Sequence, residues 1–304
     1  MKTNALWLLP ATLLFTACGG GEESTETEPE TDAAPVEESI AYGDFMSTEE
    51  VRETERIGSL EEFNAIEDKS SVIRFVSSEY NDAFPNELLD AYNLQVLSLN
   101  VQGDLPDDLG KFKNLTTLDL KGKMTTLPES LTELEHLKVV SLDGCKDLDF
   151  NQAMDVLVQC PNLEYLSLAY MGLTEVPANI GELKNLKHLR LGNNPITTLP
   201  KSFYTLPNLS HLRLGSNEGM DYAAVLASAK TLPALSTLWL QYCGLDALPA
   251  DLAEYPALTK VNWREEWSDK DADQIIATCD KEGAKFDNFD VSWNSMSGML
   301  YDVY

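Results

Sequence analysis

The feature that most constrains this chain is a unit of 21 to 26 residues that recurs from about residue 70 to residue 280. One full copy is Asn185–Pro207, in which Leu186, Leu189 and Leu191 have the spacing L-x-x-L-x-L and Asn194 follows. Residues two apart point to the same side of an extended strand, so Leu189 and Leu191 share one face. A single strand cannot bury such a face, but stacked copies can, so the repeats predict a parallel sheet with one strand per unit.

The register of the units follows from the residue that corresponds to Leu189. This position is apolar in every unit and falls at Ile73, Leu97, Leu118, Val140, Leu166, Leu189, Leu212, Leu238 and Val261. The steps between these residues all lie in the range of 21 to 26, so about nine units are predicted to stack in register.

The second half of most units carries an apolar residue followed by proline, with another apolar residue three positions later. The pairs are Phe84-Pro85, Leu105-Pro106, Leu127-Pro128, Val176-Pro177, Leu199-Pro200 and Leu248-Pro249. Proline suits the start of a short helix because its missing N–H would lack a partner there in any case, and the three-residue spacing favours a 3₁₀-type return. The two 26-residue units lack the pair and have helical spacing at Ala153–Val158 and Tyr222–Ala229, which predicts a longer helix in each.

This pattern resembles the leucine-rich repeat, and the resemblance covers about two thirds of the chain. It implies an α/β fold: a curved leucine-rich-repeat solenoid with parallel strands on the concave face and short helices or 3₁₀ turns on the convex face. The repeats are assigned to residues 70–280. Residues 281–304 either cap the far end of the solenoid or form an aromatic tail that engages a partner.

Residues 46–69 are expected to form a helical cap at the N-terminal end of the solenoid. Two capping-box patterns, Ser47-x-x-Glu50 and Ser59-x-x-Glu62, each open a short helix. A solenoid needs such a cap because its terminal unit would otherwise expose apolar core.

The first 45 residues have the composition of a leader and a tether. Residues 1–17 carry one apolar run behind Lys2, too short to cross a bilayer, which is typical of a signal peptide. The run ends at Leu14–Cys18, which resembles the bacterial lipobox and implies lipidation of Cys18 and anchoring at the outer membrane, on the periplasmic side or at the cell surface. A plain secretory signal with an accidental cysteine is the alternative. Residues 18–45 are acidic and of low complexity, so we expect a disordered tether.

Charge and cysteine usage exclude several classes of function. The net charge of −28 disfavours nucleic acid and unassisted binding to anionic lipid, so membrane contact is expected only through the lipid. The cysteines after Cys18 have no metal-ligand spacing, and either buried thiols or a disulfide would fit them. Phosphate-binding loops, nucleophile elbows and metal-binding helix motifs are absent from the sequence, so we expect neither an enzyme nor a cofactor.

The concave face holds the candidate binding residues. Side chains on either side of the strand leucines line this face, and the unusual ones gather in repeats five to eight. They are Tyr165, Tyr170, His188, Arg190, His211, Arg213, Trp239 and Tyr242. Arg190 and Arg213 would lie about one strand spacing apart, and such a positive cluster on an acidic protein is unexpected from solubility alone. Because Arg, Tyr and Trp are enriched at binding hot spots, we expect a protein or peptide ligand with acidic groups; a solvated face with a chance cluster is the alternative.

The sequence therefore predicts a non-enzymatic, lipid-anchored protein that binds a protein or peptide ligand through its concave face at the bacterial cell envelope. Two other functions stay open at this point. One is a structural or adhesive envelope protein, in which the concave face has no role. The other is a carbohydrate-binding module, since Tyr165, Trp239 and Tyr242 could stack on sugar rings.

Overall fold

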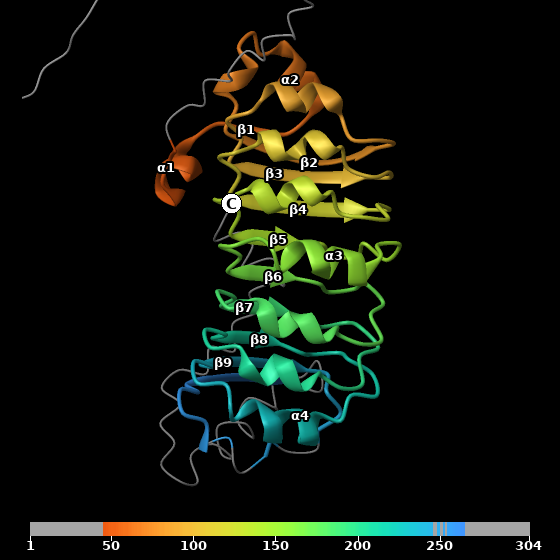
Figure 1. Ribbon diagram of the computed structural model, residues 1–304, viewed down its shortest axis with the longest axis vertical. Helices are drawn as coiled ribbons and strands as arrows, with labels where there is room; N and C mark the ends of the chain where they lie inside the picture. Colours follow the sequence, from red (N-terminus) through yellow and green to blue (C-terminus); the bar gives the residue numbers. More distant parts are fainter. Residues whose placement is uncertain (1–44, 246–247, 250–251, 253, 265–304) are drawn as a thin grey trace, which may run out of the picture. The chain divides into compact units, whose positions relative to one another are not determined.

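The computed structural model describes residues 45–245, 248–249, 252 and 254–264, all within the unit Ala41–Tyr304. The expected leader, lipidated cysteine, tether and C-terminal segment therefore lie outside the described residues, apart from residue 45 of the tether. Ten parallel strands form one sheet in the order of the sequence, from β1 to β10 (Figure 1). This architecture confirms the predicted solenoid.

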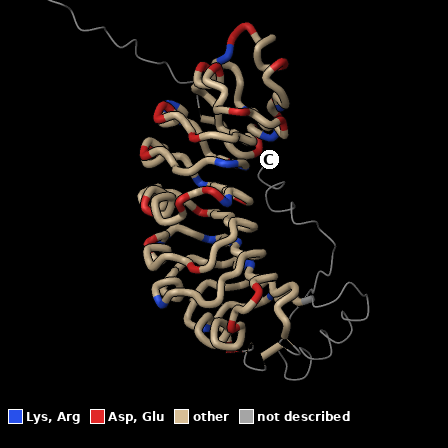
Figure 2. The backbone as a smooth tube through the Cα atoms, turned by 90° about the vertical axis from the view of Figure 1, so that its right-hand side faces the viewer, with Lys and Arg blue, Asp and Glu red and all other residues tan. Residues whose placement is uncertain are grey.

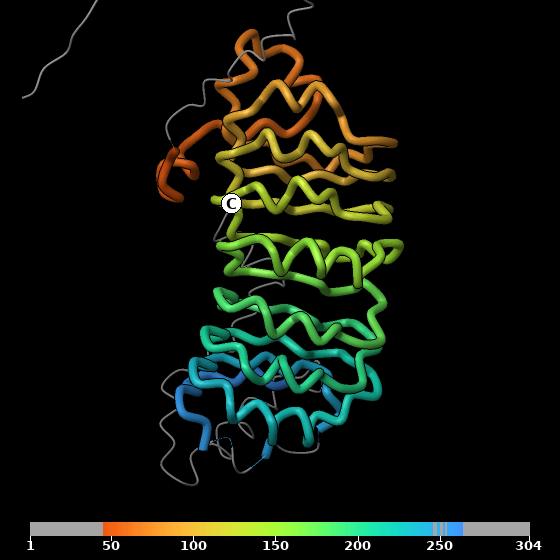
Figure 3. Tube along the Cα trace, in the orientation of Figure 1, coloured from red at the N-terminus to blue at the C-terminus, as the bar shows by residue number. Residues whose placement is uncertain are grey.

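Each repeat contributes one strand and one return segment, and consecutive units are neighbours along the Cα trace (Figure 3). The strands are β1 (Arg56–Ile57), β2 (Arg74–Asn81), β3 (Val96–Val101), β4 (Thr117–Gly122), β5 (Val139–Ser141), β6 (Tyr165–Ser167), β7 (His188–Arg190), β8 (His211–Arg213), β9 (Thr237–Gln241) and β10 (Lys260–Arg264). The 3₁₀ segments are η1 (Lys69–Ser71), η2 (Asn86–Asp90), η3 (Asp107–Lys111), η4 (Glu129–Glu133), η5 (Ala178–Glu182) and η6 (Lys201–Thr205). The α-helices are α1 (Thr48–Glu53), α2 (Leu60–Ala65), α3 (Phe150–Leu157) and α4 (Tyr222–Ala229).

The register predicted for the strands is confirmed from β3 to β10, where the residues equivalent to Leu189 are directly paired from strand to strand. The prediction is wrong in β2. There Phe75, and not Ile73, pairs with Leu97, and the Phe75 side chain is fully buried. The two residues lie two apart and share one face of a strand, so alternation alone does not distinguish them.

The return segments also match their prediction. Each of η2 to η6 begins directly after its proline, and the proline carbonyl accepts a hydrogen bond from the residue three positions on, as in Leu88 N to Pro85 O at 3.0 Å. The two units without the apolar-proline pair contain the longer helices α3 and α4, each of eight residues. Figure 2 shows the returns and the strands as two layers.

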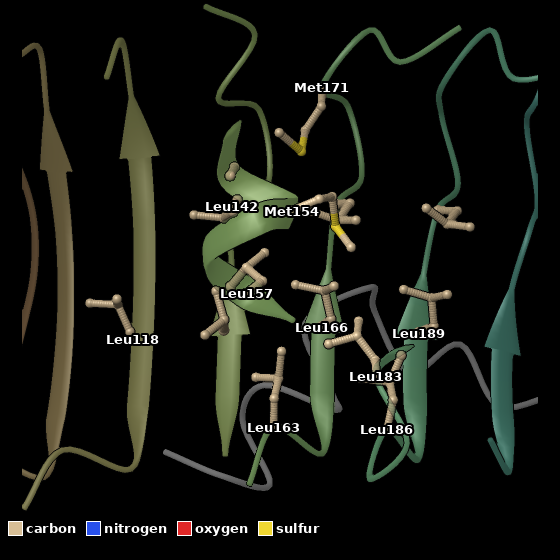
Figure 4. Packing of buried hydrophobic residues seen from close by; sticks show 14 of the residues in the cluster. Leu118, Leu142, Met154, Leu157, Leu163, Leu166, Met171, Leu183, Leu186 and Leu189 are labelled. Carbon is tan, nitrogen blue, oxygen red and sulfur yellow. The ribbon is translucent and has the colours of Figure 1, made fainter. Parts of the chain in front are cut away.

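The core lies between these layers. Leucines from neighbouring strands, among them Leu166 and Leu189, form one cluster with Met154 and Leu157 of α3 (Figure 4). Burial of side chains of this size contributes about 1.5–3 kcal/mol each relative to exposure. The stacked repeats therefore share a single continuous core.

A ladder of polar side chains lies in the turns that follow the strands. The Asn194 side-chain amide donates to Leu168 O and Leu191 O, and Asn194 N donates to Asn217 Oδ1 in the next unit. Cys145 occupies the corresponding position in its own unit and contacts Leu120 O through Sγ at 3.4 Å. Cys145, Cys160 and Cys243 are buried cysteines.

The N-terminal residues before the repeats contain both expected short helices and one unexpected strand. Ser47 and Glu50 form the predicted capping box of α1. Ser59 caps α2, but Glu62 accepts from Gly58 N and not from Ser59 N. Strand β1 was not anticipated, because its two residues carry no repeat signal; it pairs with β2 and extends the sheet by one strand. The helices of the described part are all too short, or too polar, to cross a membrane.

Candidate ligand-binding site

Four aromatic side chains from β6 to β9 form a continuous row on the face of the sheet away from the core; we call it the ring row. Tyr165, His188 and His211 are directly paired from strand to strand. The ring centroids of Tyr165 and His188 lie 5.8 Å apart, and those of His188 and His211 lie 4.2 Å apart. Trp239 continues the row at 5.8 Å from His211. The parallel register holds Tyr165, His188 and His211 at about one strand spacing from each other. Trp239 is paired with Arg213, and its ring reaches His211 from that neighbouring position.

Arg213 places a cation on the end of the ring row. Its guanidinium carbon lies 4.4 Å from the Trp239 ring centroid, within the range of a cation–π contact. Its Nε is buried and has no hydrogen-bond partner among the described residues. Burial is the main cause that lowers the pKa of Arg213, and the group stays protonated at neutral pH.

The neighbouring Arg190 is held by an ion pair that the sequence did not suggest. Arg190 Nη1 lies 2.7 Å from Asp143 Oδ2, and only 10% and 15% of the two side chains are exposed. The other oxygen of Asp143 accepts from Ser167 Oγ at 2.6 Å and from Ala169 N at 2.8 Å. Arg190 and Arg213 are directly paired between β7 and β8, as predicted. Asp143 balances the charge of Arg190, which the sequence analysis did not anticipate.

The ion pair lies beside two small residues, one at the end of the strand between its partners and one in the turn after it. Asp143 follows β5 and Arg190 ends β7, so their side chains meet across β6. Ser167 ends β6 and is paired with Ser141 and Arg190, and Ala169 follows two residues later; both side chains are small. A large side chain at either position would separate Asp143 from Arg190.

Both histidines of the ring row are neutral at pH 7. Burial is the main cause that lowers the pKa of His211 to about 4, with further contributions from His188, Arg213 and Lys260. Burial also lowers the pKa of His188, followed by the charge of Lys187. His211 Nδ1 lies 2.8 Å from Ser210 Oγ, whereas His188 Nδ1 has no hydrogen-bond partner in the described part of the chain. The ring row is thus an uncharged aromatic surface with a free nitrogen.

The other two predicted residues, Tyr170 and Tyr242, lie beyond the strand ends and outside the ring row. Each follows its strand at a turn with positive φ, 60° for Tyr170 and 55° for Tyr242. Gly122, Gly144, Asn193 and Ser216 occupy the same position in other units with positive φ. A tyrosine in the left-handed region is strained by about 1–2 kcal/mol. The structure therefore brings six of the eight predicted residues together, and it places the two tyrosines at the rim.

Comparison with known proteins places the chain by its fold. A family model described as a leucine-rich repeat region matches residues 130–279. No curated protein matches the chain. Within the described residues no group of three or more His, Cys, Asp or Glu side chains could hold a metal ion.

Several solved structures are similar to part of the chain. The ectodomain of the Arabidopsis thaliana receptor kinase GASSHO1/SCHENGEN3, in complex with CASPARIAN STRIP INTEGRITY FACTOR 2, is 25% identical over 63% of this chain and 24% of its own, with a TM-score of 0.44. Internalin C2 of Listeria monocytogenes is 24% identical over 59% of this chain and 76% of its own, with a TM-score of 0.45. A leucine-rich-repeat protein of Leptospira interrogans is 22% identical over 68% and 64%, with a TM-score of 0.43.

Proposed function

Since this chain is a leucine-rich-repeat protein, we propose that it binds a protein or peptide ligand through the ring row and Arg213, without a chemical step. The observation that carries the proposal is the row itself: four aromatic rings held by the sheet, with a guanidinium fixed on the last ring. Aromatic and arginine side chains that are already fixed lose little entropy on binding, so such a surface is preorganised.

The geometry favours a ligand with apolar groups and one well-placed carboxylate. Arg190 is balanced by Asp143, so Arg213 is the arginine whose charge is available to an anionic group. The ring row offers uncharged aromatic area beside it.

A carbohydrate ligand is less well supported by the same contacts. Sugar binding to aromatic side chains uses an open ring face. The Trp239 ring already carries the Arg213 guanidinium at 4.4 Å and stacks with His211 at 5.8 Å. These contacts reduce the ring surface that a sugar could cover, whereas an extended peptide could contact the whole row.

The proposal is tested by selecting binders from a displayed library of random peptides against the full chain that begins at Cys18. Trp239→Ala and Arg213→Ala should each weaken the selected peptides by about tenfold or more, which is the loss expected at an interface hot spot. Matched controls are Tyr80→Ala, an exposed tyrosine of β2, and Lys201→Ala on the return η6. Equal affinity of all four variants would refute the proposed surface.

We also propose that the chain is anchored by lipid on Cys18 at the bacterial outer membrane. Support comes from the leader that ends in the lipobox-like Leu14–Cys18. Cells grown with an alkyne fatty acid should label the wild-type protein and not the Cys18→Ala variant, which should also leave the membrane fraction. Labelling of Cys18→Ala would contradict the anchor. Protease treatment of intact cells then separates surface display from periplasmic location.

A further inference from the structure

The first described residues lie along the edge of the sheet from which the strands begin; we call residues 45–54 the strap. Figure 1 shows its helix α1 beside this edge. The ring of Phe45 stacks on His136, which precedes β5, at a centroid distance of 4.3 Å. Arg74, the first residue of β2, donates from Nη1 to the carbonyl of Arg52 at 3.0 Å. The strap therefore extends from the unit of β5 back to β2.

The side chain of Gln95 binds the main chain of the strap. Met46 N donates to Gln95 Oε1 at 2.8 Å, and Gln95 Nε2 donates to Met46 O at 3.2 Å, in the amide orientation that satisfies both atoms. A side-chain amide carries both an acceptor and donors, so it can bind the N–H and the C=O of one residue together. The Met46 side chain takes no part in these two bonds. Gln95 therefore recognises a main chain and not a particular side chain.

Burial marks the part of the edge that the strap covers. Gln95 is fully buried. The residues at the same position of the later units are half-buried or exposed, and they are Thr116, Lys138, Glu164, Lys187, Ser210, Ser236 and Thr259. Asn93 and Asn114 are buried too. Their equivalents in later units are exposed, and they are Asn162, Asn185 and Asn208. The edge is thus covered beside β3 and β4, where the strap lies, and open further along the sheet.

The strap is held by few buried contacts for its length. Among residues 45–54 only Val51 is buried, and it is not a member of the core cluster. The two hydrogen bonds of the capping box between Ser47 and Glu50 are exposed. Segments with few buried apolar contacts open at a lower free energy than the core. The strap can therefore leave the edge while the solenoid stays folded, and its departure uncovers the Gln95 amide.

We propose that the edge beneath the strap is a peptide-binding site, separate from the ring row, and that the strap is its reversible occupant. The site binds one residue through its N–H and C=O at Gln95. An aromatic residue before it stacks on His136, and a short capped helix after it directs its last carbonyls to Arg74. An external peptide of this chemistry binds when the strap opens. This inference does not rest on the function proposed for the ring row.

Hydrogen exchange of the full chain tests whether the strap opens by itself. Strap amides should exchange about tenfold or more slower than in a synthetic peptide of residues 45–55, and about tenfold or more faster than those of β3 and β4. Val51→Ser and Gln95→Ala should each bring the strap close to the rate of the free peptide, with β3 and β4 unchanged. Lys187→Ala is the matched control, because Lys187 has the position of Gln95 in an uncovered unit. Strap amides that exchange only together with β3 and β4, or as fast as the free peptide, would overturn the reversible occupant.

Binding of a fluorescent peptide of residues 45–55 to the full chain tests the site itself. If the strap occupies the site nine-tenths of the time, Val51→Ser in the protein should raise the apparent affinity about tenfold, because it releases the competitor. Addition of Gln95→Ala should remove that gain, whereas addition of Lys187→Ala should keep it.

A modified peptide tests recognition of the main chain. N-methylation at Met46 should abolish binding, since it removes the N–H that Gln95 accepts. N-methylation at Thr48 is the control, because the N–H of the first helical residue has no partner within the helix.

Three results would overturn the binding site. They are an affinity that Val51→Ser leaves unchanged, equal binding of the peptide N-methylated at Met46, and loss of binding on Trp239→Ala, which would place the peptide on the ring row. Failure of the proposed function is recognised differently. It would appear as library-selected peptides that ignore Trp239→Ala, and it would leave the results for the strap peptide standing.

Discussion

Removal of the Asp143 carboxylate should be among the most damaging single changes on the concave face. In Asp143→Ala, Arg190 loses its ion-pair partner at 2.7 Å with only 10% of its side chain exposed. Breaking a buried ion pair from one side costs about 3–5 kcal/mol, and the residual exposure of this pair favours the lower end. Ser167 Oγ and Ala169 N lose their acceptor as well, which adds about 1 kcal/mol in total.

We therefore expect Asp143→Ala to lower the free energy of unfolding by about 4 kcal/mol. Urea unfolding followed by far-UV circular dichroism measures this directly, provided that the slope of the transition is unchanged. The control is Asp147→Ala, an exposed aspartate in the same return, which should change stability by less than about 0.5 kcal/mol.

A double-mutant cycle separates the interaction energy between Asp143 and Arg190 from the other effects of truncating the two side chains. Arg190→Met removes the charge but keeps most of the length of the side chain. Asp143→Ala combined with Arg190→Met should be more stable than the sum of the single changes predicts, by about 2 kcal/mol. A loss below about 1 kcal/mol for Asp143→Ala, or strict additivity in the cycle, would show that the pair is hydrated and would refute the reasoning.

Three further outcomes follow from the same contacts. Asn194→Ala should cost about 3 kcal/mol in urea unfolding, because Leu168 O and Leu191 O lose a donor and Leu173 N loses an acceptor inside the core; a loss below 1 kcal/mol would contradict the ladder. The pKa of His211 is about 4 in the folded chain and ordinarily 6.5, so the unfolded chain binds more protons between these values. The melting temperature should therefore fall as the pH drops from 6.5 to 4, and His211→Gln should flatten that slope; an unchanged slope would contradict the lowered pKa. Tyr170→Gly should be more stable than Tyr170→Ala by about 1 kcal/mol in thermal unfolding, since only glycine relieves the positive φ, and equal stability would argue against strain there.

The repeat period predicts most of the fold because it determines both which residues pair between neighbouring strands and which face of each strand is buried. From Leu97 to Val261 each unit has the same apolar spacing, so pairing in any other register would expose leucines. The failures occur where the period carries little information. Ile73 and Phe75 share a face, and only packing separates them. Strand β1 has two residues and no repeat, so its pairing with β2 is visible only in three dimensions.

The sequence predicts which side chains of the candidate site are neighbours between strands, but not which charged side chains form ion pairs. Because the strands are parallel and in register, the stacking of His188 on His211 follows from the sequence alone. The partner of Arg190 does not, since Asp143 lies 47 residues earlier, two strands away in the sheet. A sequence signal for this ion pair does exist. Ser167 and Ala169 are small residues in the repeat that lies between the repeats of the acidic Asp143 and the basic Arg190.

The central claim is that the ring row and Arg213 form the recognition surface, and a hydrogen-exchange footprint of a bound peptide tests it most directly. The full chain is compared with and without a selected peptide. The account predicts slower exchange in β6 to β9, at Tyr165–Ser167, His188–Arg190, His211–Arg213 and Thr237–Gln241, with no change in η5 and η6. A footprint on the return segments, with the strands unaffected, would contradict it.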